Sequence, residues 1–124
     1  MKKTILAVAL FGAFAAHQAQ AACDYPVAPG KFPDGSVATR EVMQAAKKQV
    51  VQYDADINSY LVCIRSEFDT QIATQTDSKQ KAQLQKAHVK KEEAALAEVH
   101  DVVGRFNEQL KAWKARNAPD KKTS

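Results

Sequence analysis

The stretch REVMQAAKKQVVQYDADINSYLVCI (residues 40–64) decides the fold of this chain. Its apolar residues recur at alternating spacings of three and four, at Met43, Ala46, Val50, Tyr53, Ile57, Tyr60 and Ile64. This spacing puts them on one stripe of an α-helix, in a heptad pattern that a second helix must cover. Thr39 precedes the stripe as the predicted N-cap. We therefore predict a helix over residues 40–74.

A second helix is predicted after a short polar break, TQTDS (residues 74–78). Asp77 is its predicted N-cap, and Gln80 is placed to complete a capping box. Its apolar stripe comprises Leu84, Ala87, Ala94, Ala95, Val99, Val102, Val103, Phe106, Leu110 and Trp113. We predict this helix over residues 78–116, followed by a disordered tail over residues 117–124. Two long helices joined by so short a connection must run antiparallel, so the expected fold is all-α, a long coiled-coil-like two-helix hairpin.

The chain has two cysteines, Cys23 and Cys63. In an exported protein, an even number of cysteines favours a disulfide. Their pairing would tether the extended N-terminal segment (residues 22–38), which holds three of the four prolines, to the first helix. The distance permits this pairing, because Cys63 lies roughly 36 Å from the start of that helix and the extended segment reaches about 50 Å.

The N-terminal segment is also expected to cover apolar surface. Tyr25, Val27 and Phe32 should lie in the groove between the helices, and Pro33-Asp34-Gly35 predicts a turn. The apolar arc of the first helix is wider than a single seam requires, which indicates more than one neighbour. The additional apolar residues are Val42, Val51, Leu61 and Val62.

Residues 1–21 predict an export signal. A positive start (Met1–Lys3), an apolar run (Thr4–Ala16) and the small residues of Ala19–Ala21 are typical of a cleaved signal peptide. The mature protein would then act in the periplasm or outside the cell. A lipoprotein is not expected, because a lipobox needs a large aliphatic residue where Gln20 stands. Removal of the signal lowers the formal net charge from +4 to about +2, which argues against nucleic acid as a partner.

Three segments of the chain resemble a group of small secreted proteins of Gram-negative bacteria that are known only as hypothetical proteins. They are PDGSVAT (residues 33–39), YLVC (60–63) and RFN (105–107), and the likeness covers residues 23–116. Members of the group often have Glu where Val42 stands, so their capping box is missing here. The resemblance implies a helical protein of the periplasm and brings no activity with it.

Motifs for catalysis or metal binding do not stand out. Asp54-Ala55-Asp56-Ile57-Asn58 resembles the start of an EF-hand loop. Ser59 stands where that loop needs Gly, and Arg65 stands where it needs a bidentate acid. His88 and His100 are expected at the surface, and no GxSxG sequence occurs. We therefore predict a protein that is not an enzyme, with no cofactor and no metal site.

The remaining candidates are interaction residues near the C-terminal end. Trp113 is the best candidate for an exposed anchor, and Lys111, Lys114 and Arg116 form a basic cluster beside it. We predict a non-enzymatic periplasmic interaction or structural protein that presents a face of the hairpin to a periplasmic protein or to a second copy, as a homodimer. The alternatives are a binder of anionic lipid or polysaccharide at the envelope surface, using the basic end, and a holdase-type periplasmic chaperone.

Overall fold

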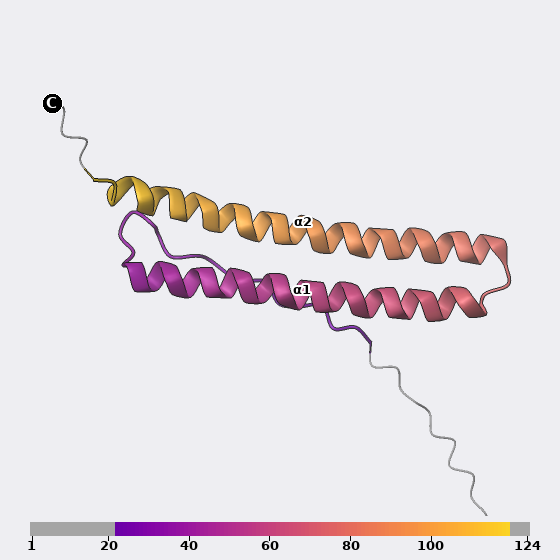
Figure 1. Ribbon diagram of the computed structural model, residues 1–124. Helices are drawn as coiled ribbons and strands as arrows, with labels where there is room; N and C mark the ends of the chain where they lie inside the picture. The colour runs from indigo at the N-terminus through magenta and orange to yellow at the C-terminus, as the bar shows by residue number, and fades with distance from the viewer. Residues whose placement is uncertain (1–21, 120–124) are drawn as a thin grey trace, which may run out of the picture.

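Two long α-helices lie side by side and form a hairpin (Figure 1). They are α1 (Arg40–Thr74) and α2 (Ser78–Arg116), and they are the helices predicted from the sequence. The computed structural model describes residues 22–119, so the predicted signal peptide (1–21) and the end of the predicted tail (120–124) lie outside the described residues. The described part of the chain contains no strand, and the all-α hairpin is confirmed.

Side chains cap both helices at their N-termini. Thr39 Oγ1 accepts a hydrogen bond from the backbone N–H of Val42 at 3.3 Å, and Asp77 Oδ1 accepts one from Gln80 at 2.8 Å. The capping box predicted for α2 is not formed, because the backbone N–H of Asp77 donates to Gln75 Oε1 at 3.2 Å. The backbone N–H of the N-cap is therefore bound by the side chain of Gln75, which precedes the cap, and not by that of Gln80.

The core lies along the seam between the helices, and Phe32 and Ala38 are added to it from the segment before α1. From α1 it takes Met43, Ala46, Tyr53, Ile57, Tyr60 and Ile64. From α2 it takes His88, Ala95, Val102 and Phe106. The predicted stripe of α1 is buried, with Val50 half-buried, whereas Ala87 and Ala94 of the predicted α2 stripe are exposed. The inward face of α2 repeats every seven residues through His88 and Ala95, and each of the two exposed alanines lies about 100° away from it.

The core overturns the prediction that His88 lies at the surface. Only 7% of its surface is exposed, and its ring stacks on Phe68 with centroids 4.5 Å apart and planes 11° apart. Its Nε2 atom lies 3.0 Å from Glu92 Oε1, in electrostatic contact but not aligned for a hydrogen bond. The imidazole is buried because His88 continues the inward face of α2 one heptad before Ala95 and stacks there on Phe68 of α1.

Candidate interaction surface

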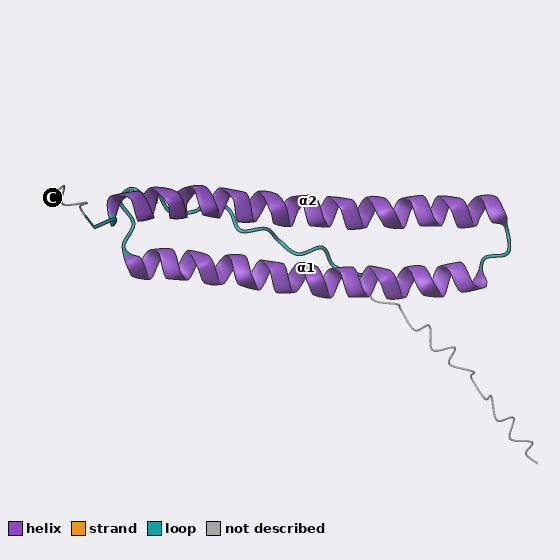
Figure 2. Cartoon of the chain, turned by 45° about the horizontal axis from the view of Figure 1, so that its top comes forward, coloured by secondary structure: helices purple, strands orange, loops and turns teal. Residues whose placement is uncertain are grey.

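Residues 22–38, which we call the strap, form a third layer on one flank of the hairpin. The strap runs back from the start of α1 and crosses from α2 to α1 behind both helices in the view of Figure 2. Its N-terminal end is fixed by the predicted disulfide between Cys23 and Cys63, whose Cα atoms are 5.8 Å apart. The backbone N–H of Cys23 also donates to Glu67 Oε1 at 3.2 Å. The disulfide is thus confirmed, and its entropic stabilisation by loop closure is about 4 kcal/mol.

One cluster of metal-ligand residue types lies at this end of the strap. The sulfur atoms of Cys23 and Cys63 and a carboxylate oxygen of Glu67 lie within 4.8 Å of one another. Both sulfurs are committed to the disulfide, so they have no thiolate to offer a metal ion.

Aromatic contacts hold the first part of the strap. Tyr25 packs edge-on against Tyr60, with ring centroids 4.9 Å apart, and its hydroxyl donates to Glu98 Oε2 on α2. Partial burial raises the pKa of Tyr25 well above its usual range, and the bond to the Glu98 carboxylate raises it further. Burial also raises the pKa of Tyr53, whose hydroxyl is buried without a hydrogen-bond partner in the described part of the chain.

These tyrosines predict a loss of stability at alkaline pH. A raised pKa in the folded state means that the phenol ionises more readily in the unfolded chain. The contribution is therefore complete below pH about 10 and is lost as the pH rises above that value. Thermal unfolding between about pH 8 and 11 should show this fall, with tyrosinate absorbance appearing together with unfolding. Tyr25→Phe should flatten the dependence, and an unchanged slope in that variant would contradict the assignment.

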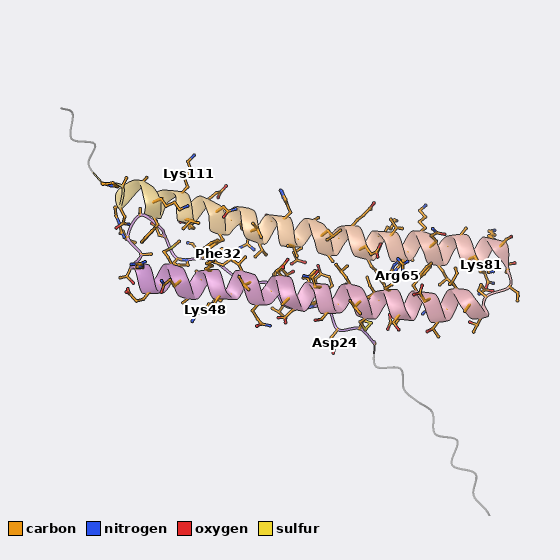
Figure 3. All side chains as sticks on the ribbon, viewed as in Figure 1. Asp24, Phe32, Lys48, Arg65, Lys81 and Lys111 are labelled. Carbon is orange, nitrogen blue, oxygen red and sulfur yellow. A yellow bond between two sulfur atoms is a disulfide. The ribbon has the colours of Figure 1, made fainter. Side chains whose placement is uncertain are left out.

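Phe32 anchors the middle of the strap. It is only 6% exposed and points into the space between the helices (Figure 3). Its ring meets Phe106 edge-on, with centroids 5.7 Å apart, and the guanidinium of Arg105 lies 5.5 Å from its centroid. Arg105 also donates to the carbonyl oxygens of Gly30 at 2.9 Å and Pro29 at 3.4 Å. Arg105 therefore binds both the backbone and the main aromatic anchor of the strap.

The predicted turn forms at the C-terminal end of the strap, just before α1, and packs directly on α2. The carbonyl oxygen of Asp34 accepts hydrogen bonds from Val37 at 3.2 Å and Ala38 at 2.9 Å. Gly35 donates its N–H to Gln109 Oε1 at 3.0 Å. A Cβ atom on Gly35 would lie 1.8 Å from the backbone oxygen of Gln109. The turn thus approaches α2 so closely that only glycine fits.

Gly35→Ala should consequently dislodge the turn. Either the turn or the α2 backbone must shift, and the bond to Gln109 is lost in both cases. Gly30→Ala is a matched control, because nothing lies within 4 Å of the added Cβ atom. The fluorescence of Trp113, the single tryptophan, should change in Gly35→Ala and not in Gly30→Ala, with a lower melting temperature in the first variant only. Equal behaviour of the two variants would contradict this packing.

The predicted basic cluster at the C-terminal end divides into two parts. Arg116 donates to the carbonyl oxygens of Ser36, at 2.8 Å, and of Ala38, so its guanidinium holds the strap. Lys111 and Lys114 are exposed and form no ion pair within residues 22–119, and Lys111 points away from α1 (Figure 3). A binding role for these lysines stays a prediction.

Trp113 is not the exposed anchor that the sequence suggested. It is half-buried and packs against the core, and its Nε1 atom is buried without a partner in the described chain. The turn at Gly35 lies beside this part of α2, since a Cβ atom on Gly35 would come within 3.0 Å of the backbone nitrogen of Trp113. The approach of the strap to this turn of α2 could not be read from the helix periodicity.

The strap covers less apolar surface than predicted. Val27 is 93% exposed, and Val51 and Val62 remain 60% and 72% exposed. Tyr25 and Phe32 do cover the groove as predicted, but Val27 points away from it. The reason is that hydrogen bonds between the strap backbone and side chains of α2 hold the strap on one flank of the hairpin. The strap therefore does not lie over the wide apolar arc of α1.

The opposite flank of the hairpin carries an apolar row of α2 that the strap does not cover and that is partly exposed. On α2 the row comprises four aliphatic residues at strict seven-residue spacing, Val89, Leu96, Val103 and Leu110. Glu98 and Arg105, which bind the strap, each lie two residues beyond a member of the row, about 200° around the helix. On α1, Leu61 likewise lies two residues before Cys63, which holds the strap, so their side chains are about 200° apart around the helix. We call this flank, with Val50 and Leu61 of α1, the open face.

Members of the open face differ in exposure. Leu96 is 58% exposed and Val89 is 39% exposed, whereas Val103 and Leu110 are half-buried and Leu110 packs against the core. The stripe predicted for residues 78–116 includes Val103 and Leu110 and does not separate them from the seam. A second heptad register, offset from the first, was the signal that could have identified the row.

Comparisons with protein-family models, with curated proteins and with solved structures found no match. Neither α1 nor α2 contains a stretch with the length and hydrophobicity of a membrane span, and the described residues 22–119 hold no other helix.

Proposed function

We propose that this protein is a non-enzymatic interaction protein of an exported, oxidising compartment, the periplasm in a Gram-negative cell, and that it presents the open face of its hairpin to a protein partner. The observation that carries the proposal is the partly exposed aliphatic row of α2, with Leu96 58% and Val89 39% exposed, on the flank opposite the attached strap. A contiguous apolar surface on a soluble protein commonly marks an interaction site. The disulfide supports the compartment, because disulfides persist in oxidising environments.

Site-specific photo-crosslinking in the cell tests this proposal. A photoreactive amino acid in place of Leu96 should give a discrete crosslinked product with another protein. The same substitution at Val62, which is more exposed but lies on the outer side of α1, is the matched control and should give none. Equal products at the two positions, or none at Leu96, would contradict an interaction through the open face.

A second candidate is binding to an anionic envelope surface through Lys111 and Lys114. Their exposure and their lack of ion pairs in the described chain favour it. Electrostatic attachment falls steeply with ionic strength, whereas apolar docking depends little on salt. Co-sedimentation with vesicles containing about one-third anionic lipid, with and without Lys111→Ala/Lys114→Ala, separates this candidate from the first.

A further inference from the structure

The shape of the open face suits one kind of occupant. The aliphatic row of α2 runs along the flank without the strap, and Val50 and Leu61 of α1 are half-buried. A third helix can pack on such a face by placing its own apolar stripe against the row. The α2 row from Val89 to Leu110 is about 32 Å long, which a partner helix of roughly 21 residues would span.

Charged residues differ between the ends of the α2 row and its middle. Lys86 precedes Val89 by three residues and Lys114 follows Leu110 by four, so each lysine neighbours an end of the row on the helix surface. Both are exposed, and neither forms an ion pair in the described part of the chain. The carboxylate of Glu93, three residues before Leu96 on α2, borders the middle of the row instead.

The same charges disfavour a second copy of the chain. Antiparallel packing of two α2 rows about their midpoint would bring Lys86 of one copy beside Lys114 of the other, at both ends. Parallel packing would set each lysine against its own equivalent. Like charges facing across an interface select against such pairings and favour a partner of opposite charge.

Resting on the proposed function, we infer that the open face binds an amphipathic helix of another protein, whose apolar stripe is bounded at both ends by acidic residues. Leu96 and Val103 receive the apolar stripe. Lys86 and Lys114 pair with the acidic residues at its two ends.

Two synthetic peptides test the inference. Both have about 28 residues and the same leucine heptads, but one carries Glu and the other Lys in its first and last turns. Fluorescence anisotropy of the labelled peptides should show that the mature protein binds the Glu-ended peptide at least about tenfold more tightly at low salt. This preference should shrink as ionic strength rises. Equal affinities for the two peptides would overturn the inference.

Variants of the protein assign the effect to the open face. Lys86→Glu/Lys114→Glu should reverse the preference between the peptides, whereas Lys48→Glu, on the side of α1 away from α2 (Figure 3), should leave it unchanged. Leu96→Glu should weaken both peptides by about tenfold or more. Val62→Glu, its exposed control, should weaken neither. A reversal by Lys48→Glu, or equal losses in Leu96→Glu and Val62→Glu, would overturn the assignment.

Two further outcomes separate this inference from the proposed function. A wild-type dimer in sedimentation equilibrium that Leu96→Glu dissociates would make a second copy the occupant and overturn the inference. A second outcome is that Leu96 crosslinks to a partner in the cell while the Glu-ended and Lys-ended peptides bind with equal affinity. This result would overturn the inference and leave the proposed function standing. No crosslink at Leu96 would remove the proposed function itself.

Discussion

Phe106→Ala should unfold more than about 10 °C below the wild-type protein, the largest effect expected of any single substitution here. Phe106 is 6% exposed and contacts the core of the hairpin on one side and the ring of Phe32 on the other. Truncation of a buried phenylalanine costs about 3–5 kcal/mol, because transfer energy is lost and a cavity remains. Circular dichroism at increasing temperature measures the shift.

The control for this prediction is Val62→Ala, a truncation of a side chain that is 72% exposed. It should melt close to the wild-type temperature, since exposed positions rarely change stability by more than about 0.5 kcal/mol. Hydrogen exchange should also increase around Phe32 in Phe106→Ala, because the strap loses its aromatic contact. A Phe106→Ala protein that melts with the wild type would show that the interface between strap and helices contributes little.

Cys63→Ser should lower the free energy of unfolding by about 2–4 kcal/mol, because it releases a closed loop in the unfolded chain. The strap should be freed only in part. Residues 23–28 depend on the disulfide and Tyr25, whereas Phe32 and the turn at Gly35 keep their own contacts with α2. Hydrogen exchange measured by mass spectrometry should therefore show lost protection near the cysteine and retained protection near the turn.

The double variant Cys23→Ser/Cys63→Ser is the control, and it should match Cys63→Ser because either change breaks the same bond. Intact mass with and without reductant should differ by two hydrogens in the wild type and not in either variant. A uniform loss of protection along residues 22–38 would contradict independent anchors, and no loss of stability would contradict the role of the disulfide.

The helices could be predicted from the sequence because their determinants are local. The seam from Met43 to Ile64 repeats at helical spacing, and Thr39 and Asp77 are strong N-caps. The disulfide followed from the count of cysteines together with the reach of an extended segment. Each of these inferences uses information from neighbouring residues or from chain length alone.

What escaped prediction depends on contacts between distant segments. Arg105 and Arg116 look like ordinary charged residues on a helix, and only the path of the strap, more than seventy residues away in sequence, gives them backbone carbonyls to bind. The burial of His88 likewise depends on Phe68 facing it from the other helix. The open face was hidden for a different reason, because its heptads overlap those of the seam.

The attachment of the strap at Cys63 divides the hairpin into two regions that differ in how many segments pack together. From Cys63 toward the start of α1, three segments of chain pack together, namely α1, α2 and the strap. Aromatic rings lie between them. Beyond Cys63, toward the Gln75 turn, two helices alone remain, joined by the thinner contacts of His88 and Leu84. Thermal fluctuations should therefore open the hairpin from its turn inward and stop at the disulfide, so that the tip behaves as a separate, less stable cooperative unit.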